Sequence, residues 1–132
     1  MSSESFEVVE ISSGLHEDTL WVSVGFSSEL QELDALHFVC AMDVDEQDRR
    51  LGHNAMYLER FDQAYSCYNG AEAIVIGATG IQIKLNAHGC ESLSLPNAVR
   101  FLVASDLKGW SEAVSIFRRM QDLECGRVLR AA

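Results

Sequence analysis

The clearest pattern in the sequence is an alternation of apolar and polar residues over positions 74 to 85. Branched apolar side chains recur at every second position, at Ile74 and Ile76 and then at Ile81, Ile83 and Leu85. A period of two places such side chains on one face of an extended chain. Gly77 and Gly80 stand between the two runs and supply the positive-φ positions that a short hairpin loop needs. The pattern therefore predicts a β-hairpin of two half-buried strands.

Similar short apolar runs, separated by turn residues, predict more strands on both sides of this hairpin. The two strands of the hairpin are expected at residues 71–76 and 80–85. Six further strands are expected at residues 6–11, 19–26, 36–42, 56–60, 64–68 and 99–103. Asn69-Gly70 has the composition of a tight reversal. Because strands joined by tight turns usually pair with their neighbours in the sequence, we expect a mainly antiparallel β-meander.

One segment near the end of the chain has a helical period instead. Its apolar residues fall on a single stripe, at Trp110, Ala113, Val114, Phe117 and Met120. Ser105 or Asp106 is suited to cap the start of this helix and Gly126 to end it, so we expect a helix over 107–124. The 132 residues are thus predicted to form one α+β domain, residues 1–132, with this amphipathic helix packed on the sheet.

Charge is distributed unevenly along the chain, whose formal net charge is −10. Residues 1–66 hold 14 acidic and three basic side chains, whereas residues 67–132 hold six acidic and seven basic ones. A negative field repels nucleic-acid phosphates and anionic membranes and favours a basic partner. Solubility alone is a sufficient reason for an acidic composition, so the charge narrows the class of partner without identifying one.

Targeting signals are not visible in the sequence. No apolar run approaches the ~20 residues that a membrane-spanning helix needs. The first ten residues, MSSESFEVVE, lack the basic and then apolar regions of a secretory signal. We therefore expect a cytoplasmic protein whose four cysteines stay reduced.

Catalytic and metal-binding patterns are also absent from the sequence. The four cysteines and four histidines lie too far apart to form a local metal-ligand motif. The acidic run that begins at Asp43 resembles the start of a calcium loop, but Asp48 and Asn54 replace its essential glycine and closing glutamate. That run is then either a solvated turn, with Asp48 accepting backbone hydrogen bonds, or a contact surface. We expect no cofactor, no metal and no enzymatic activity.

Several short motifs resemble the immunity protein ten family. They are EQDRRLG at 46–52, Tyr-x-Glu-x-x-Asp-Gln from Tyr57, Ser-Cys-Tyr-Asn-Gly at 66–70 and Glu-Asp-Thr-Leu at 17–20. The resemblance covers roughly residues 17–120. Members of that family are bacterial antidotes to polymorphic toxins, so the resemblance implies a chain that binds and neutralises a cognate toxin domain.

A toxin-binding surface would draw on the acidic half of the chain and on its tyrosines. We expect an acidic patch that steers a basic toxin into contact, with tyrosines as buried anchors. The candidate residues are Glu29, Glu32, Asp34, Asp43, Asp45 and Glu46 for the patch and Tyr57 and Tyr65 for the anchors.

Two alternatives remain open from the sequence alone. In the first alternative, the chain is a small enzyme or ligand-binding domain with a pocket between the sheet and the helix. Its catalytic residues would then come from His53, Asp48 and Cys67. The other alternative is a homodimer that buries the sheet face carrying Trp21.

Overall fold

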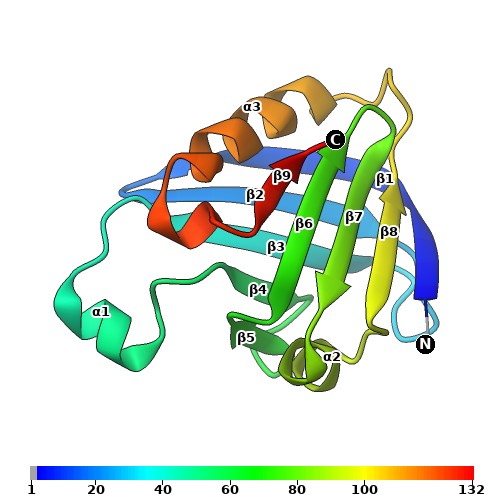
Figure 1. The fold of residues 1–132 in the computed structure, drawn as a ribbon. Helices are drawn as coiled ribbons and strands as arrows, with labels where there is room; N and C mark the ends of the chain where they lie inside the picture. Colours follow the sequence, from blue (N-terminus) through cyan, green and yellow to red (C-terminus); the bar gives the residue numbers. More distant parts are fainter. Residues whose placement is uncertain (1–2) are drawn as a thin grey trace.

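The computed structural model describes residues 3–132 and is built on one mixed sheet (Figure 1). Within those residues the sheet has nine strands: β1 (Ser3–His16), β2 (Thr19–Phe26), β3 (Asp34–Ala41), β4 (Tyr57–Arg60), β5 (Ser66–Tyr68), β6 (Ala71–Gly77), β7 (Gly80–Leu85), β8 (Ala98–Leu102) and β9 (Leu129–Ala131). The helices are α1 (Glu46–Leu51), α2 (Ala87–Leu93) and α3 (Trp110–Gln121), with a 3-10 turn, η1 (Glu124–Gly126). The predicted α+β class is confirmed.

Strand β1 joins two parts of the sheet that run in different directions (Figure 1). Its first residues pair in parallel with β8, and from Val8 onward it pairs with β2 in antiparallel fashion, with a register shift between Val8 and Glu10. The strand order is β5-β4-β3-β2-β1-β8-β7-β6-β9. We call β2–β5 with the second part of β1 half-sheet I, and β6–β9 with the first part of β1 half-sheet II.

The predicted simple meander is wrong. Most neighbours pair in antiparallel fashion, but β1–β8 and β6–β9 are parallel. Asn69-Gly70 does not close a hairpin, because β5 lies at one edge of the sheet and β6 near the other. The chain instead passes close to α2 there: a Cβ on Gly70 would lie 2.9 Å from the Cα of Gly89. Only a residue without a side chain permits this approach.

The core lies between the two half-sheets and α3. Phe6, Phe26 and Phe101 contact one another, with ring centroids 4.6 to 5.7 Å apart. Between half-sheet I and α3, Phe38 of β3 packs edge-to-face against Phe117 of α3, with ring centroids 5.3 Å apart. The predicted apolar stripe of α3 is confirmed, since Trp110, Ala113, Phe117 and Met120 are all buried. The stripe packs α3 over β1 and β2 (Figure 1).

The predicted start of this last helix is wrong. The helix begins at Trp110, and its N-cap is Gly109 with a φ of 95°, without a side-chain cap from Ser105 or Asp106. A Cβ on Gly109 would lie 2.5 Å from the carbonyl oxygen of Ile11. The close approach of the chain to β1 therefore fixes where the helix starts. Gly126 belongs to η1 and does not end the helix.

Two short helices and one strand were not predicted: α1, α2 and β9. The α1 helix is a single capping box, in which Asp45 and Asp48 each accept a hydrogen bond from the other's backbone N–H. The expected backbone role of Asp48 is thereby confirmed. No helix among residues 3–132 combines the length and apolar character needed to cross a membrane. The four cysteines are free thiols in the structure, and all but Cys90 are buried.

Candidate partner-binding surface

Half-sheet I has one face toward the core and one face toward the outside. Along β2, β3 and β4 every second residue is buried, and the residues between them are partly exposed. Because α3 packs against the buried set, the partly exposed set forms an outer face. This outer face collects side chains from five strands, so its composition depends on strand register.

Aromatic side chains from three strands line up across this outer face. The strand register places Gly14, Trp21, Val39, Tyr57 and Tyr68 side by side, and we call this line the Trp21 row. The indole of Trp21 lies against Gly14, where an added Cβ would be only 3.3 Å from the ring. The rings of Tyr57 and Tyr68 are 5.0 Å apart. His53 stacks on Tyr68 at 4.4 Å and extends the row beyond the sheet edge.

A polar row runs beside the Trp21 row. It consists of Ser12, Ser23, His37, Glu59 and Ser66. Ser23 Oγ lies 2.6 Å from His37 Nδ1, and the Tyr57 hydroxyl donates to Glu59 Oε1 at 2.7 Å. Burial raises the pKa of Tyr57, and the hydrogen bond to Glu59 also raises it. Tyr57 therefore remains a protonated donor, oriented by the carboxylate beside it.

Acidic residues gather at one end of half-sheet I. Glu17 and Asp18 form the turn between β1 and β2, and the Asp18 carbonyl accepts a hydrogen bond from Met42 N at 2.8 Å. This contact brings the β1–β2 turn beside the segment that follows β3. We call the exposed acids of these two segments, Glu17, Asp18, Asp43, Asp45 and Glu46, the acidic end. It borders the Trp21 row, because Trp21 and Val39 lie two residues inside the Thr19–Ala41 pair.

The structure divides the predicted acidic patch into separate groups. Asp43, Asp45 and Glu46 lie at the end of β3, close to the Tyr57 end of β4. Glu29 and Glu32 lie in the loop before β3, roughly 23 Å away along an eight-residue strand. Tyr65 belongs to this distant end as well, where it packs against Phe61 at 4.9 Å. Tyr57 and Tyr65 therefore do not sit side by side.

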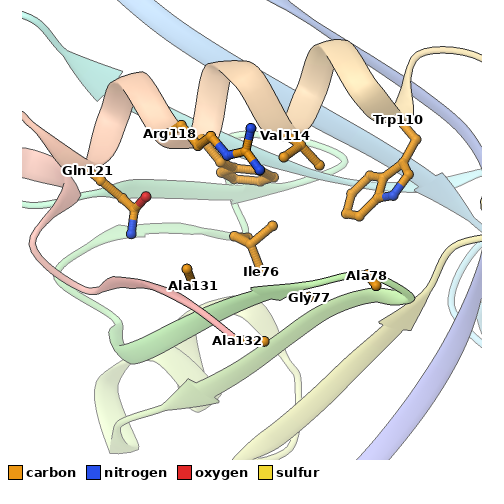
Figure 2. A pocket seen from close by; sticks show the side chains of 10 residues that line it. Ile76, Gly77, Ala78, Trp110, Val114, Arg118, Gln121, Ala131 and Ala132 are labelled. Atoms are coloured by element: carbon orange, nitrogen blue, oxygen red, sulfur yellow. The ribbon is translucent and has the colours of Figure 1, made fainter.

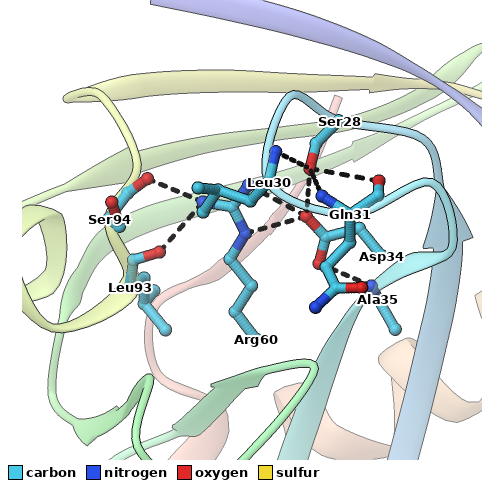
Figure 3. A network of polar contacts seen from close by, with 8 residues as sticks. All are labelled: Ser28, Leu30, Gln31, Asp34, Ala35, Arg60, Leu93 and Ser94. Carbon is cyan, nitrogen blue, oxygen red and sulfur yellow. Dashed lines mark hydrogen bonds and ion pairs between the residues drawn. The ribbon is translucent and has the colours of Figure 1, made fainter.

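Asp34 is not a surface acid, and this differs from the expectation. Its residue is 2% exposed, and its carboxylate pairs with Arg60, which is 3% exposed, at 2.9 and 3.0 Å (Figure 3). Ser28 Oγ donates to the same carboxylate at 2.6 Å. Arg60 also donates to the carbonyl oxygens of Leu93 and Ser94 on the C-terminal end of α2. The pair joins β3, β4 and α2 and is unavailable to a partner.

Helix α1 is attached to the body of the protein by an exposed ion pair. Arg49 contacts both carboxylate oxygens of Glu124 at 2.9 to 3.2 Å, and Asn54 donates to Glu124 at 2.8 Å. These contacts lower the pKa of Glu124 to about 2. They hold the acidic end in place, since Asp45 and Glu46 start the same helix. Asp45 is itself occupied by the capping box, so Asp43 and Glu46 are the acids of this segment that are free for a partner.

The residues considered for catalysis are not brought together. His53 stacks on the outward-facing Tyr68, whereas Cys67, the preceding residue, points to the buried face of β5. Burial raises the pKa of the Cys67 thiol, which disfavours a nucleophilic thiolate. Within the described range of 3–132, no three His, Cys, Asp or Glu side chains form a group able to hold a metal ion.

Tyr68 and His53 were not among the binding residues predicted from the sequence. The alternation in residues 19–26 already placed Trp21 on the face opposite Leu20, Val22 and Val24. That signal gave the face of the residue but not its neighbours. Tyr68 and His53 join the row through the β4–β5 pairing and the α1 loop, which periodicity does not specify.

Comparison with known proteins gives one family. The family model described as Immunity protein 10 matches residues 7–109, which include all of half-sheet I. No curated protein matches the chain, and no solved structure matches it.

Proposed function

The chain belongs to the immunity protein 10 family, and from this membership we propose that it neutralises a cognate toxin domain by binding it through the Trp21 row and the acidic end. The observation that carries the proposal is the continuous line from Trp21 through Tyr57 and Tyr68 to His53 on an outer sheet face. Tyrosine and tryptophan dominate the binding energy of protein interfaces, where they supply large rigid contact areas.

The acids beside this row indicate a basic partner. Asp43 and Glu46 are exposed in the segment that follows β3, at the end of half-sheet I nearer to Trp21 and Tyr57, so they act on a partner before it touches the sheet. Long-range attraction of this kind accelerates association, and the aromatic anchors then slow dissociation. The partner we propose is therefore a toxin domain with Lys or Arg residues surrounding an apolar contact.

The outer face of half-sheet II carries charges of both signs, whereas the exposed charged residues of the acidic end are all negative. Lys84, Arg100 and Arg130 are exposed there, on β7, β8 and β9, and Lys84 lies 3.5 Å from the carboxylate of the exposed Glu72 on β6. A basic toxin is therefore attracted more strongly to the acidic end than to this face. The charge distribution thus supports one binding face over the other.

Co-expression with the toxin domain encoded beside this chain tests the proposal. Growth rescue together with a co-purifying complex is expected for the wild type. Trp21→Ala combined with Tyr57→Ala should abolish both, because it removes the two aromatic anchors on either side of Val39. Val75→Ala is the matched control, since Val75 is a partly exposed residue on the outer face of half-sheet II. Full rescue by the double variant, with a stable complex, would contradict the proposed face.

The proposal also includes where the protein acts and whether it associates with itself. It takes residues 1–132 as one domain that acts in the cytoplasm and uses the Trp21 row for the toxin instead of for a second copy of itself. Light scattering of the free chain at several concentrations distinguishes these uses. A concentration-dependent dimer that dissociates with Trp21→Ala would assign the row to self-association.

A further inference from the structure

A crevice of about 310 Å³ lies between α3 and the β6–β9 edge of half-sheet II (Figure 2). It is on the opposite layer of the molecule from the Trp21 row, because α3 packs on the core side of the sheet. Its size falls at the lower end of the range of small-molecule sites. A crevice of this volume is suited in size to a small molecule.

The crevice exists because α3 packs over β1 and β2, while the strands facing its other side carry small residues. Gly77, Ala78 and Ala131 face the helix across the gap, so no large side chain fills it. Trp110 and Phe117 form its apolar inner wall and are only 7% and 1% exposed. A ligand body in this position would contact apolar atoms on both sides.

The mouth of the crevice is cationic and polar. Arg118 and Gln121 are exposed residues one turn apart on α3, and their side chains extend over the opening toward Ile76 and Ala131 (Figure 2). The ion pairs formed among the described residues do not include Arg118. Its guanidinium is therefore free to receive an anion, and the amide of Gln121 supplies a second donor.

We propose that this crevice binds a small amphipathic carboxylate, with the carboxylate on Arg118 and an unbranched apolar tail between Ile76 and Val114. A guanidinium at the mouth selects a negative head group, and the apolar wall selects a tail without polar atoms. The proposal goes beyond toxin binding, because it uses a different layer of the protein and a different class of partner.

Titration of the full chain with octanoate tests the site, and the two tryptophans provide the readout. Trp110 lines the crevice and Trp21 lies on the distant outer face, so their indole N–H signals in an NMR spectrum report separately. Octanoate should shift the Trp110 signal saturably and leave the Trp21 signal unchanged. Hexanoate should bind about 15-fold more weakly, from about fourfold per methylene removed. Neutral 1-octanol should bind about tenfold more weakly than octanoate.

Variants of adjacent arginines separate a built site from general attraction to a basic helix. Arg118→Gln should weaken octanoate binding about tenfold, whereas Arg119→Gln, which removes the same charge one residue away, should change it less than twofold. Ala131→Leu should fill the crevice and abolish the shift. Thermal melts check that each variant is folded. Absence of a saturable Trp110 shift, or equal effects of the two arginine variants, would overturn the proposal while leaving toxin binding untouched.

Discussion

Asp34 and Arg60 meet inside the protein although they lie 26 residues apart in the sequence. Arg60 uses three nitrogens, two toward the carboxylate of Asp34 and one toward the carbonyl oxygens of Leu93 and Ser94. Ser28 and the backbone N–H of Ala35 complete the coordination of the carboxylate. A buried ion pair is stable only when its remaining hydrogen bonds are satisfied in this way.

Removing Arg60 should therefore be costly. We predict that Arg60→Met lowers the free energy of unfolding by about 3–5 kcal/mol, because it leaves the Asp34 carboxylate buried without its partner. Urea denaturation measures this change. Arg50→Met is the control, since Arg50 is exposed on α1 and should change stability by less than about 0.5 kcal/mol. A loss below about 1 kcal/mol for Arg60→Met would show that the pair does not hold β3, β4 and α2 together.

The pKa of Glu124 makes the attachment of α1 depend on pH. Arg49 and Asn54 lower that pKa from 4.5 to about 2, so the ionised carboxylate favours the folded arrangement. The attachment is fully present above pH 4.5 and is lost as the pH falls toward 2. We predict that the protection factors of the α1 amides, which correct the exchange rates for their intrinsic pH dependence, fall over this pH range in the wild type.

Glu124→Gln provides the comparison for this pH effect, since other carboxylates titrate in the same range. The variant should show fast α1 exchange already at pH 7 and a smaller pH dependence between 4.5 and 2. Identical pH profiles for the α1 amides in the two proteins would refute the role of Glu124.

At the residue scale, the sequence predicted whether a side chain is exposed better than it predicted which side chains it contacts. Asp43 and Glu46 are exposed acids as expected from their polar run, and Cys40 is a buried core residue. Asp34 was misplaced because its fate depends on Arg60, which reaches it only after β3 and β4 pair. The identity of a side chain sets its chemistry, but a distant partner decides whether it is at the surface.

At the scale of elements, periodicity identified the long helix α3 and missed the two short helices. The α1 and α2 helices have six and seven residues, too few to show an apolar stripe. They are instead defined by their caps, Asp45 with Asp48 and Asn86 with Gly89 N. Those capping residues were visible in the sequence, so a search for Asp or Asn followed by a partner three residues later was the available signal.

Helix α3 should contribute strongly to stability through one aromatic contact. Phe117 is 1% exposed and packs edge-to-face on Phe38. We predict that Phe117→Ala lowers the free energy of unfolding by about 3–5 kcal/mol, the usual cost of a cavity left by a buried phenylalanine. Chemical denaturation measures the loss, with the exposed Ser115→Ala on the same helix as control. A cost near that of the control would mean that α3 is not part of the core.

At the scale of the whole molecule, the order of the strands in the sheet could not be predicted from sequence patterns. The alternation in each strand specifies which side chains share a face, but pairing between β1 and β8 joins segments more than 90 residues apart. The same limit applies to β9, a three-residue strand that exists only because it pairs with β6. The Trp21 row depends on this order, since four strand pairings bring its members together.

The negative charges of the acidic end should make toxin binding depend on salt. We predict that Asp43→Lys with Glu46→Lys slows association with the toxin domain at low salt, and that the difference from wild type shrinks as salt screens the charges. Stopped-flow fluorescence measures the association rate. Asp45 is left intact because its loss would also uncap α1.

Glu91→Lys with Glu112→Lys is the matched control for this experiment, because both residues are exposed acids on α2 and α3 and give the same change in net charge. Association that is equally slow in both double variants would assign the effect to net charge and not to the acidic end.

Hydroxyl-radical footprinting of the complex would show whether the toxin covers the outer face of half-sheet I. Trp21, Tyr57, Tyr68 and His53 react readily with hydroxyl radicals and share this face. Mass spectrometry should show protection of all four in the complex, while Leu33 and Leu102, exposed at 81% and 41% away from the row, keep their free-state labelling. Unchanged labelling of the four aromatic residues in a complex that still forms would contradict the account.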